Sequence, residues 1–217
     1  MERSIFGSIS SCLYVVRKIV SMGGLACDEK RESISYNRFI EKKNKVKIMI
    51  DGITTYGSTD LIEKLQENRD NAVFLLTIGT TETSEIEGIS GAGASAELTA
   101  YTPAADVEFM VLGEVRCTDT AAETVVDGAA APTPARLAKA GLQLANIPFV
   151  VVDAGSKIKP DIEYVSFGKE YGRDIRTGKG VLNPLEIFEN AKDLGAELSN
   201  RHEILLIGES IPAGTTT

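Results

Sequence analysis

The chain has 217 residues, of which 43% are hydrophobic and 25% are charged, and its formal net charge is −8. This length allows one good core, with one domain as the default and two as the upper bound. The acidity excludes the basic patch by which proteins usually bind nucleic acid, although backbone N–H groups can still hold phosphate.

No run of 18 apolar residues occurs, so we expect no transmembrane segment, no membrane partner and a cytoplasmic protein. Cys12, Cys27 and Cys117 lie far apart without a C-x-x-C pair, which predicts reduced thiols rather than disulfides or zinc ligands. The single histidine, His202, is expected to end a helix in solvent, and we expect no metal site.

Residues 1–48 differ from the rest of the chain. Ile5–Val20 is apolar but interrupted by serine and basic residues, so it is too diluted for a signal peptide. We expect residues 1–48 to be a poorly ordered extension, or sequence upstream of a true start at Met49. Residues 49–217 would then form one incomplete α/β domain.

Apolar runs and helix-start signals alternate from residue 46 onward. Strands are predicted at 46–50, 72–78, 106–112, 148–152, 162–167 and 203–207, and residues 114–131 read as irregular. Helices are predicted from Ser58 or Thr59 to Arg69, from Thr133-Pro134 to Asn146, and from Asn183-Pro184 to Asn200. In the last helix Leu185, Phe188 and Leu198 are expected to face inward.

This alternation predicts a doubly wound, mostly parallel, Rossmann-like sheet covered on both faces. Ligands of such sheets bind outside the carboxyl ends of the strands. The residues that follow the predicted strands are small, polar and acidic: Gly79 to Ser84, Gly113-Glu114, Asp153 to Lys157, and Gly208-Glu209. Small residues leave room for a ligand, and carboxylates can orient ribose hydroxyls or accept protons.

The last ten residues look like a phosphate cradle. Gly214 would let the backbone approach an anion, and Thr215 to Thr217 would offer N–H and hydroxyl donors at the start of a helix. The P-loop ending Gly-Lys-Ser/Thr, a correctly spaced G-x-G-x-x-G and a G-x-S-x-G elbow are all missing, which argues against an ATPase, a dinucleotide enzyme and an α/β hydrolase.

Each of these features also has a plain structural explanation. A glycine-rich loop often serves only a tight turn, Glu82 and Glu209 can be solvated, and Asp153 can cap the turn that follows it. The argument for a ligand site therefore rests on several such features sharing one predicted sheet edge.

Several longer segments, in this order, carry a family resemblance. They are Glu82–Ser84, Gly88–Ala94, Glu97–Thr99, Tyr101–Asp106, Pro132–Ala135, Asp153–Gly155, Asp174–Lys179 and Gly208–Thr217. Over about residues 70–217 the chain resembles the archaeal branch of the nicotinate-nucleotide–dimethylbenzimidazole phosphoribosyltransferase family. The resemblance implies a glycosyltransferase that moves ribose phosphate from nicotinate mononucleotide to a benzimidazole-type base in cobamide (vitamin B12) synthesis, without a cofactor or metal.

By the same resemblance, two groups of residues would bind substrate. Gly208, Glu209, Gly214, Thr215 and Thr216 would hold the phosphate and ribose. Gly79, Glu82, Thr83, Ser90, Gly91, Asp153 and Gly155 would line the pocket for the base and substrate.

The general base of the family lies in a region beyond the position of Thr217, so the resemblance assigns no catalytic residue to this chain. An enzyme that needs a complementary C-terminal chain, or that forms a homo-oligomer, is therefore one expectation. The alternative is a non-catalytic module that binds a nucleotide or phosphate.

Overall fold

The computed structural model describes residues 14–17, 47–50, 53–56, 60–93, 95–119, 123–126 and 129–214. The elements are β1 (Tyr14–Arg17), β2 (Lys47–Ile50), β3 (Ile53–Tyr56), α2 (Asp60–Glu67), β4 (Ala72–Ile78), α3 (Ala96–Thr99), α4 (Thr102–Leu112), β5 (Glu123–Val126), β6 (Ala129–Pro132), α5 (Ala135–Ala145), β7 (Phe149–Asp153), β8 (Val165–Ser166), α6 (Pro184–Arg201) and β9 (Ile204–Ser210). Short 3₁₀ turns follow at Arg69–Asn71, Glu82–Glu85 and Ile175–Thr177.

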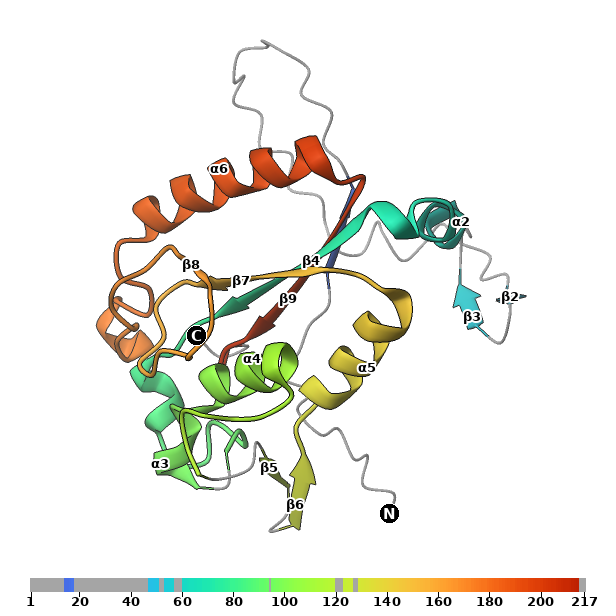
Figure 1. Ribbon diagram of the computed structural model, residues 1–217. Coiled ribbons are helices and arrows are strands. Elements are labelled where there is room, and N and C mark those ends of the chain that lie inside the picture. The colour runs from blue at the N-terminus through green and yellow to red at the C-terminus, as the bar shows by residue number, and fades with distance from the viewer. Residues whose placement is uncertain are drawn as a thin grey trace.

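A five-stranded sheet in the order β1-β9-β4-β7-β8 forms the centre (Figure 1). Strands β9, β4, β7 and β8 run parallel, and β1 pairs antiparallel with β9 at one edge. The mixed α/β, Rossmann-like fold predicted from the alternation of strands and helices is confirmed. The register aligns Ile78 with Asp153 and Ser210, so the carboxyl ends of three strands lie at one edge.

Helices cover both faces of this sheet. In Figure 1, α4 and α5 lie on one face and α6 lies on the other. The core packs Phe74, Leu76 and Ile78 of β4 against Val107 and Met110 of α4 and against residues of α5. The apolar run of β4 is buried because helices cover both of its faces.

Helix α5 begins and ends as the sequence predicts. The Thr133 hydroxyl accepts a hydrogen bond from the backbone N–H of Ala135 at 3.2 Å, and Pro134 precedes the first helical residue. Asn146 ends the helix in the left-handed conformation, at φ 53°. These signals act locally, which is why they can be recognised in the sequence.

The segment predicted as a strand at 106–112 is instead the C-terminal part of α4. Pro103 stands in the first turn of this helix, where its missing N–H costs nothing, and Gly113 ends it at φ 85°. A short apolar run does not distinguish a buried strand from a buried helix. Gly113-Glu114 therefore follows a helix and does not belong to the carboxyl edge of the sheet.

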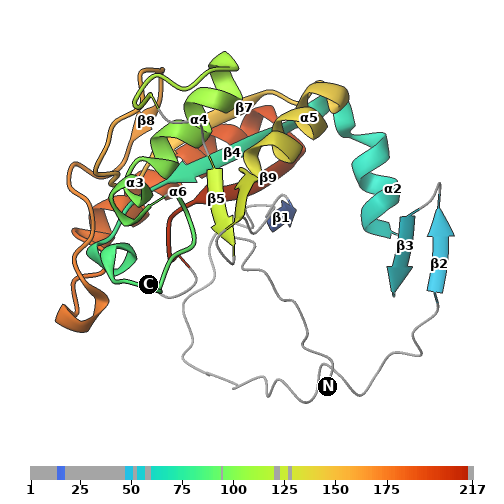
Figure 2. The same cartoon turned by 90° about the horizontal axis from the view of Figure 1, so that it is seen from below.

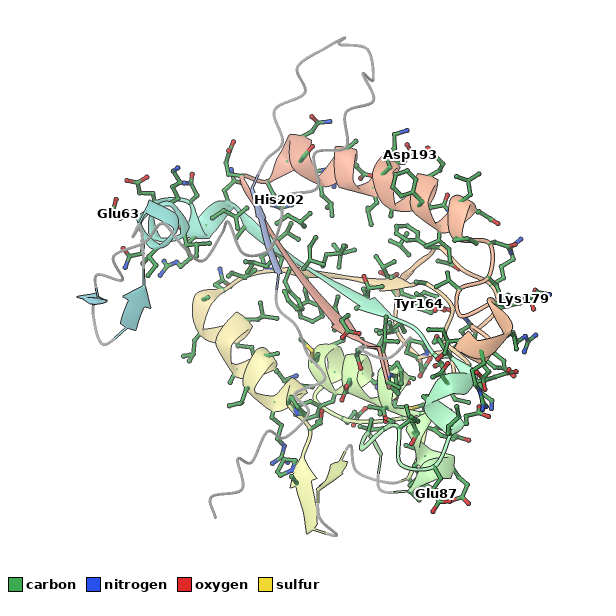
Figure 3. All side chains as sticks on the ribbon, turned by 180° about the vertical axis from the view of Figure 1, so that it is seen from behind. Glu63, Glu87, Tyr164, Lys179, Asp193 and His202 are labelled. Atoms are coloured by element: carbon green, nitrogen blue, oxygen red, sulfur yellow. The ribbon has the colours of Figure 1, made fainter. Side chains whose placement is uncertain are left out.

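Helix α6 begins at Pro184 as predicted, but its two faces differ from the expectation. Leu198 is buried, whereas Leu185 is 73% exposed and Phe188 is 61% exposed. Asn183 makes no side-chain capping hydrogen bond, because it adopts a left-handed backbone. His202 follows the helix as its C-cap, beside the start of β9 (Figure 3).

Two further expectations change. The stretch 114–131, read as irregular, contains β5 and the start of β6, which form a two-stranded antiparallel ribbon. Strand β9 extends to Ser210, so Gly208 and Glu209 lie within it rather than in a turn. Within 1–48, β1 and the start of β2 are strands, and the rest of that segment lies outside the described residues.

Helix α2 and the antiparallel ribbon of β2 and β3 lie to one side of the sheet (Figure 2). No helix in the described part of the chain is long and apolar enough to cross a bilayer.

Candidate functional site

A cavity of about 440 Å³ lies at the carboxyl ends of β4, β7 and β9, on the face of the sheet that α6 covers. Ligand cavities in proteins typically have this volume. Its lining residues are Gly79, Thr80, Thr81, Ala154, Gly155, Glu170, Gly172, Gly180, Val181, Leu182, Ile187, Glu209, Ile211 and Gly214. Four of the residues predicted for the site therefore meet here: Gly79, Gly155, Glu209 and Gly214.

Backbone hydrogen bonds fix the floor of the cavity. The N–H of Thr80 donates to the carbonyl of Gly155 at 3.0 Å, which extends the pairing of β4 and β7 past the strand ends. The N–H of Gly172 then donates to the carbonyl of Thr80 at 2.9 Å. Residues far apart in the sequence are thus held side by side by main-chain groups, independently of side-chain chemistry.

Glu209 is the most unusual polar group in the cavity. Its Oε2 atom is buried and has no hydrogen-bond partner among the described residues. Burial raises the pKa of Glu209 above its usual value, and a hydrogen bond from the backbone N–H of Ile211 opposes this rise. An unpaired buried acceptor costs about 1–3 kcal/mol, so the site is suited to a ligand that donates a hydrogen bond.

Gly214 lies directly against this carboxylate. A Cβ atom at Gly214 would be 3.0 Å from Oε2 of Glu209 and 2.9 Å from the carbonyl oxygen of Ile211. The sequence predicted that Gly214 would lie close to the phosphate of a ligand. In the structure it lies close to the carboxylate of Glu209 instead. Thr215 and Thr216, the remaining parts of the predicted cradle, lie outside the described residues.

Asp153 is fully buried at the end of β7. Its Oδ1 accepts hydrogen bonds from the N–H of Gly155 at 2.9 Å, the N–H of Ser156 at 2.7 Å and the Ser156 hydroxyl at 2.9 Å. Its Oδ2 pairs with Lys159 at 2.5 Å. This carboxylate caps the turn after β7, which was the structural alternative considered for Asp153 in the sequence. Asp153 therefore shapes the cavity but does not line it.

Glu82 and Thr83 hold a neighbouring loop. Glu82 accepts hydrogen bonds from Arg173 and from the N–H of Asp174, both at 3.1 Å, and Thr83 accepts from the N–H of Ile175 at 3.0 Å. Neither residue lines the cavity. Their side chains position the loop that does.

Three other predicted residues lie elsewhere. Ser90 accepts a hydrogen bond from the N–H of Ala92 at 3.2 Å, and Gly91 beside it is exposed. Gly208 lies on the opposite face of β9, where a Cβ atom would be 2.5 Å from the ring of Phe74. The structure does not bring these three residues to the cavity.

The loop from Gly168 to Leu182 forms one wall of the cavity, and none of its residues was predicted for the site. Glu170, Gly172, Gly180, Val181 and Leu182 of this loop line the cavity, and Lys179 projects from its outer edge (Figure 3). The sequence feature that could have indicated this loop is the glycine at position 155. In the structure, its φ of 125° and its close approach to the Glu170 backbone leave no space for a side chain. Such a glycine marks a place where two backbones meet.

Two cations near this loop, Lys157 and Arg173, are paired with carboxylates. Lys157 lies 5.3 Å from the centre of the Tyr171 ring and bonds to Glu85 at 2.5 Å. Arg173 lies 5.1 Å from the same ring and pairs with Glu82. The described residues also contain no group of three His, Cys, Asp or Glu side chains that could hold a metal.

Comparison with known proteins identifies long relatives. The chain is 50% identical over 169 residues to a UPF0284 protein of Methanothermobacter thermautotrophicus, an alignment that covers 78% of this chain and 46% of that protein. It is 46% identical over 151 residues to UPF0284 proteins of Saccharolobus solfataricus and Saccharolobus islandicus, covering 69% of this chain and 42% of each. No protein-family profile matches. The relatives of this chain are thus named UPF0284 proteins, and the chain spans less than half of their length.

Proposed function

We propose that this chain is the nucleotide-binding part of a phosphoribosyltransferase that takes nicotinate mononucleotide as donor and a benzimidazole-type base as acceptor, in assembly of the lower loop of cobamides. The observation that carries the proposal is the buried, unpaired Oε2 of Glu209, a residue that lines the cavity at the strand ends. The similarity of residues 70–217 to that enzyme family selects the substrates.

Glu209 is suited to a ribose and not to a phosphate. A carboxylate repels a phosphate, but it accepts hydrogen bonds from hydroxyl groups, and the 2′- and 3′-hydroxyls of a ribose are such donors. In the proposed reaction the bond from the anomeric carbon to nicotinate breaks and a bond to a nitrogen of the base forms. The base loses a proton, which a general base outside this chain would accept.

A hydrogen bond from a ribose hydroxyl to Glu209 would displace no other partner among the described residues and would increase the affinity for the ligand. The Glu209 carboxylate is already partly desolvated, so a ligand hydroxyl replaces no ordered protein partner among the described residues. A hydrogen bond to a charged group contributes about 1.5–3 kcal/mol, equivalent to roughly a 10- to 100-fold change in affinity.

The test is calorimetric titration of nicotinate mononucleotide into the purified chain. We expect binding that Glu209→Ala weakens by about 10- to 100-fold, while Glu163→Gln, a change of an exposed glutamate outside the cavity, has no effect. Ribose 5-phosphate should compete for the site, and an analogue without the 2′- and 3′-hydroxyls should not. Equal binding by the wild type and Glu209→Ala would refute the role of this carboxylate.

A non-catalytic nucleotide-binding module is the second candidate, because an unpaired acceptor can hold a ribose without transferring it. Release of nicotinate in the presence of benzimidazole separates the two candidates. The assay is run on the chain alone and on the chain mixed with the part of the Methanothermobacter relative that it does not match. Binding without release in both mixtures would favour the binding module.

A further inference from the structure

One wall of the cavity at the strand ends is apolar. Val181 and Leu182 end the loop that borders the cavity, Ile187 lies in the first turn of α6, and all three line the cavity. These three residues are the apolar wall. Leu182 and Ile187 are half-buried and Val181 is 54% exposed, so a ligand in the cavity can reach them. The neighbouring Gly180 packs so closely on Gly172 that no side chain fits at Gly172, which fixes the wall to the strand ends.

Main-chain groups form the floor of the cavity beside this wall. Gly79, Gly155 and Gly214 line it without side chains. Ile211 also lines the cavity, and its side chain lies 3.7 Å from the position that a Cβ atom of Gly79 would take. Glycine lets a ligand approach the backbone closely, and aliphatic side chains exclude water from an apolar ligand. The cavity is therefore complementary to a planar ring that lies on the floor.

The charges of the lining residues select the kind of ring. The described lining residues include two carboxylates, Glu170 and Glu209, and no lysine, arginine or histidine. Nη2 of Arg173 lies 3.6 Å from Oε2 of Glu170, and its Nη1 lies 3.1 Å from Oε1 of Glu82, so two carboxylates share this cation. Carboxylates in surroundings of low dielectric constant repel an anionic ring such as nicotinate. A benzimidazole is uncharged at neutral pH and is not repelled.

We propose that the apolar wall is the subsite of the acceptor base, and that it selects an uncharged planar nitrogen heterocycle against an anionic one. This inference rests on the proposed function, because the acceptor must lie beside the anomeric carbon of the ribose that Glu209 would hold. The sequence had placed the base near Glu82, Thr83 and Ser90, none of which lines the cavity. Leu182 and Ile187 are instead the residues that determine which base binds.

A second hollow, the groove beside α5, is the other place for an apolar ring. Its volume is about 430 Å³, and Leu137, Leu142 and Leu206 are among its lining residues. The carboxylate of Glu209 lies against Gly214, which lines the cavity and is not among the described lining residues of the groove. A base that reacts with a ribose at this carboxylate therefore belongs in the cavity. Leu137, which is 81% exposed and lines the groove, provides the control.

The test is a ligand-observed NMR titration of the purified chain with three separate rings. We expect benzimidazole to bind with a dissociation constant in the millimolar range or below, since few atoms make the contact. Nicotinamide and nicotinate have the same size and differ in charge, so their ratio isolates the selection by charge. Nicotinamide should bind roughly tenfold more tightly than nicotinate.

Two variants assign the ring to the apolar wall. Ile187→Ala should weaken benzimidazole binding by roughly tenfold, because it removes apolar contact with the ring. Val181→Lys places a cation at the wall in an exposed position, and it should cancel most of the preference for nicotinamide over nicotinate. The matched control Leu137→Lys puts the same charge beside the groove and should leave that preference unchanged.

Titration with ribose 5-phosphate separates this inference from the proposed function. Its affinity should fall in Glu209→Ala and stay unchanged in Ile187→Ala, because it carries no ring. Ring binding that depends on Ile187, in a chain that binds neither ribose 5-phosphate nor nicotinate mononucleotide, would support the subsite and count against the phosphoribosyltransferase.

Three results would overturn the inference while leaving the proposed function intact. One is nicotinate binding as tightly as nicotinamide, and another is ring binding that Leu137→Lys changes and Ile187→Ala does not. The third is a chain that binds nicotinate mononucleotide through Glu209 but binds none of the three rings. No binding of any probe by the folded chain, as judged by circular dichroism, would refute both proposals.

Discussion

Asp106 and Glu108 lie two residues apart on α4, and their carboxyl groups have pKa values shifted in opposite directions. Burial raises the pKa of Asp106, against hydrogen bonds of 2.7 Å each from the hydroxyls of Thr133 and Ser210. Burial also acts to raise the pKa of Glu108, but three backbone N–H groups donate to that carboxylate and bring its pKa below the usual value. The difference lies in the hydrogen-bond donors: three backbone N–H groups favour the charged form of Glu108, whereas two hydroxyl groups do not offset the burial of Asp106.

Asp106→Asn is expected to flatten the pH dependence of stability. Because the pKa of Asp106 is raised in the folded state, its stabilising contribution is complete below the usual value of 3.8 and is lost as the pH rises through the folded-state pKa. The free energy of unfolding of the wild type, relative to Asp106→Asn, should thus decrease as the pH rises from about 4 toward 7. Urea unfolding at several pH values measures this difference, and a difference that increases with pH would contradict it.

Glu108→Gln should have the opposite pH dependence. Glu108 accepts the N–H groups of Arg116 at 2.6 Å and of Cys117 and Asp161 at 2.8 Å, so it ties two loops to α4. The change should cost about 2–3 kcal/mol at pH 7, because an amide nitrogen cannot accept these bonds. The loss should shrink as the pH falls below the usual Glu value of 4.5, where the wild-type carboxylate also becomes protonated. A loss that is constant with pH would argue against a charged Glu108.

Cys117 is expected to be a slow nucleophile in the folded protein. Burial and the neighbouring Glu108 carboxylate raise the pKa of its thiol from 9.0 to about 12. In a variant that retains this cysteine alone, with Cys12→Ser and Cys27→Ser, alkylation by iodoacetamide at pH 8 should be on the order of a hundredfold slower than in urea. Mass spectrometry of timed samples gives the rate. Equal rates in the folded and unfolded chain would show that the thiol is not held beside Glu108.

Gly155 and Gly141 should respond in opposite ways to replacement by alanine. Gly155→Ala places a Cβ atom against the Glu170 backbone at a φ of 125°, which should destabilise the protein by about 3 kcal/mol or more. Gly141→Ala fills open space on α5 and should stabilise it by about 0.5–1 kcal/mol. Thermal unfolding of the two variants measures both changes. A stable Gly155→Ala variant would mean that the loop carrying Glu170 lies further from β7.

Binding of nicotinate mononucleotide should depend on the ionisation of Glu209. Burial raises the pKa of this group above its usual 4.5, and the proposed ribose contact needs the carboxylate form. Affinity should therefore fall as the pH is lowered toward that raised value, and Glu209→Gln should remove this part of the pH dependence. Titrations of both proteins at matched pH separate it from ionisation of the nucleotide phosphate. Identical pH profiles for the two proteins would contradict the proposed contact.

The predictable parts of the fold are those fixed by local chemistry. The apolar run of β4 and the Thr133-Pro134 start of α5 depend on neighbouring residues, and both appear in the structure as the sequence predicts. The run 106–112 was predicted wrongly because a short, mainly apolar run does not distinguish a buried strand from a buried helix. The upstream Pro103 was the better guide.

The same division applies to the candidate site. Gly79, Gly155 and Glu209 could be brought together in advance, because the carboxyl ends of parallel strands share one edge. The loop from Gly168 to Leu182 could not be assigned to the site from the sequence. Its position depends on a backbone bridge between Thr81 and Gly172, which are 91 residues apart in sequence. The bridge is a product of the tertiary structure and leaves no local pattern.

Strand β9 separates two hollows. Leu206, Gly208 and Ser210 line the groove beside α5, while Glu209 borders both this groove and the cavity at the strand ends. Two ligands held in these hollows would share a common wall only one strand thick. Thermodynamic reciprocity then requires that, if a ligand in one hollow changes the affinity of the other hollow for its own ligand, the second ligand changes the affinity for the first by the same factor.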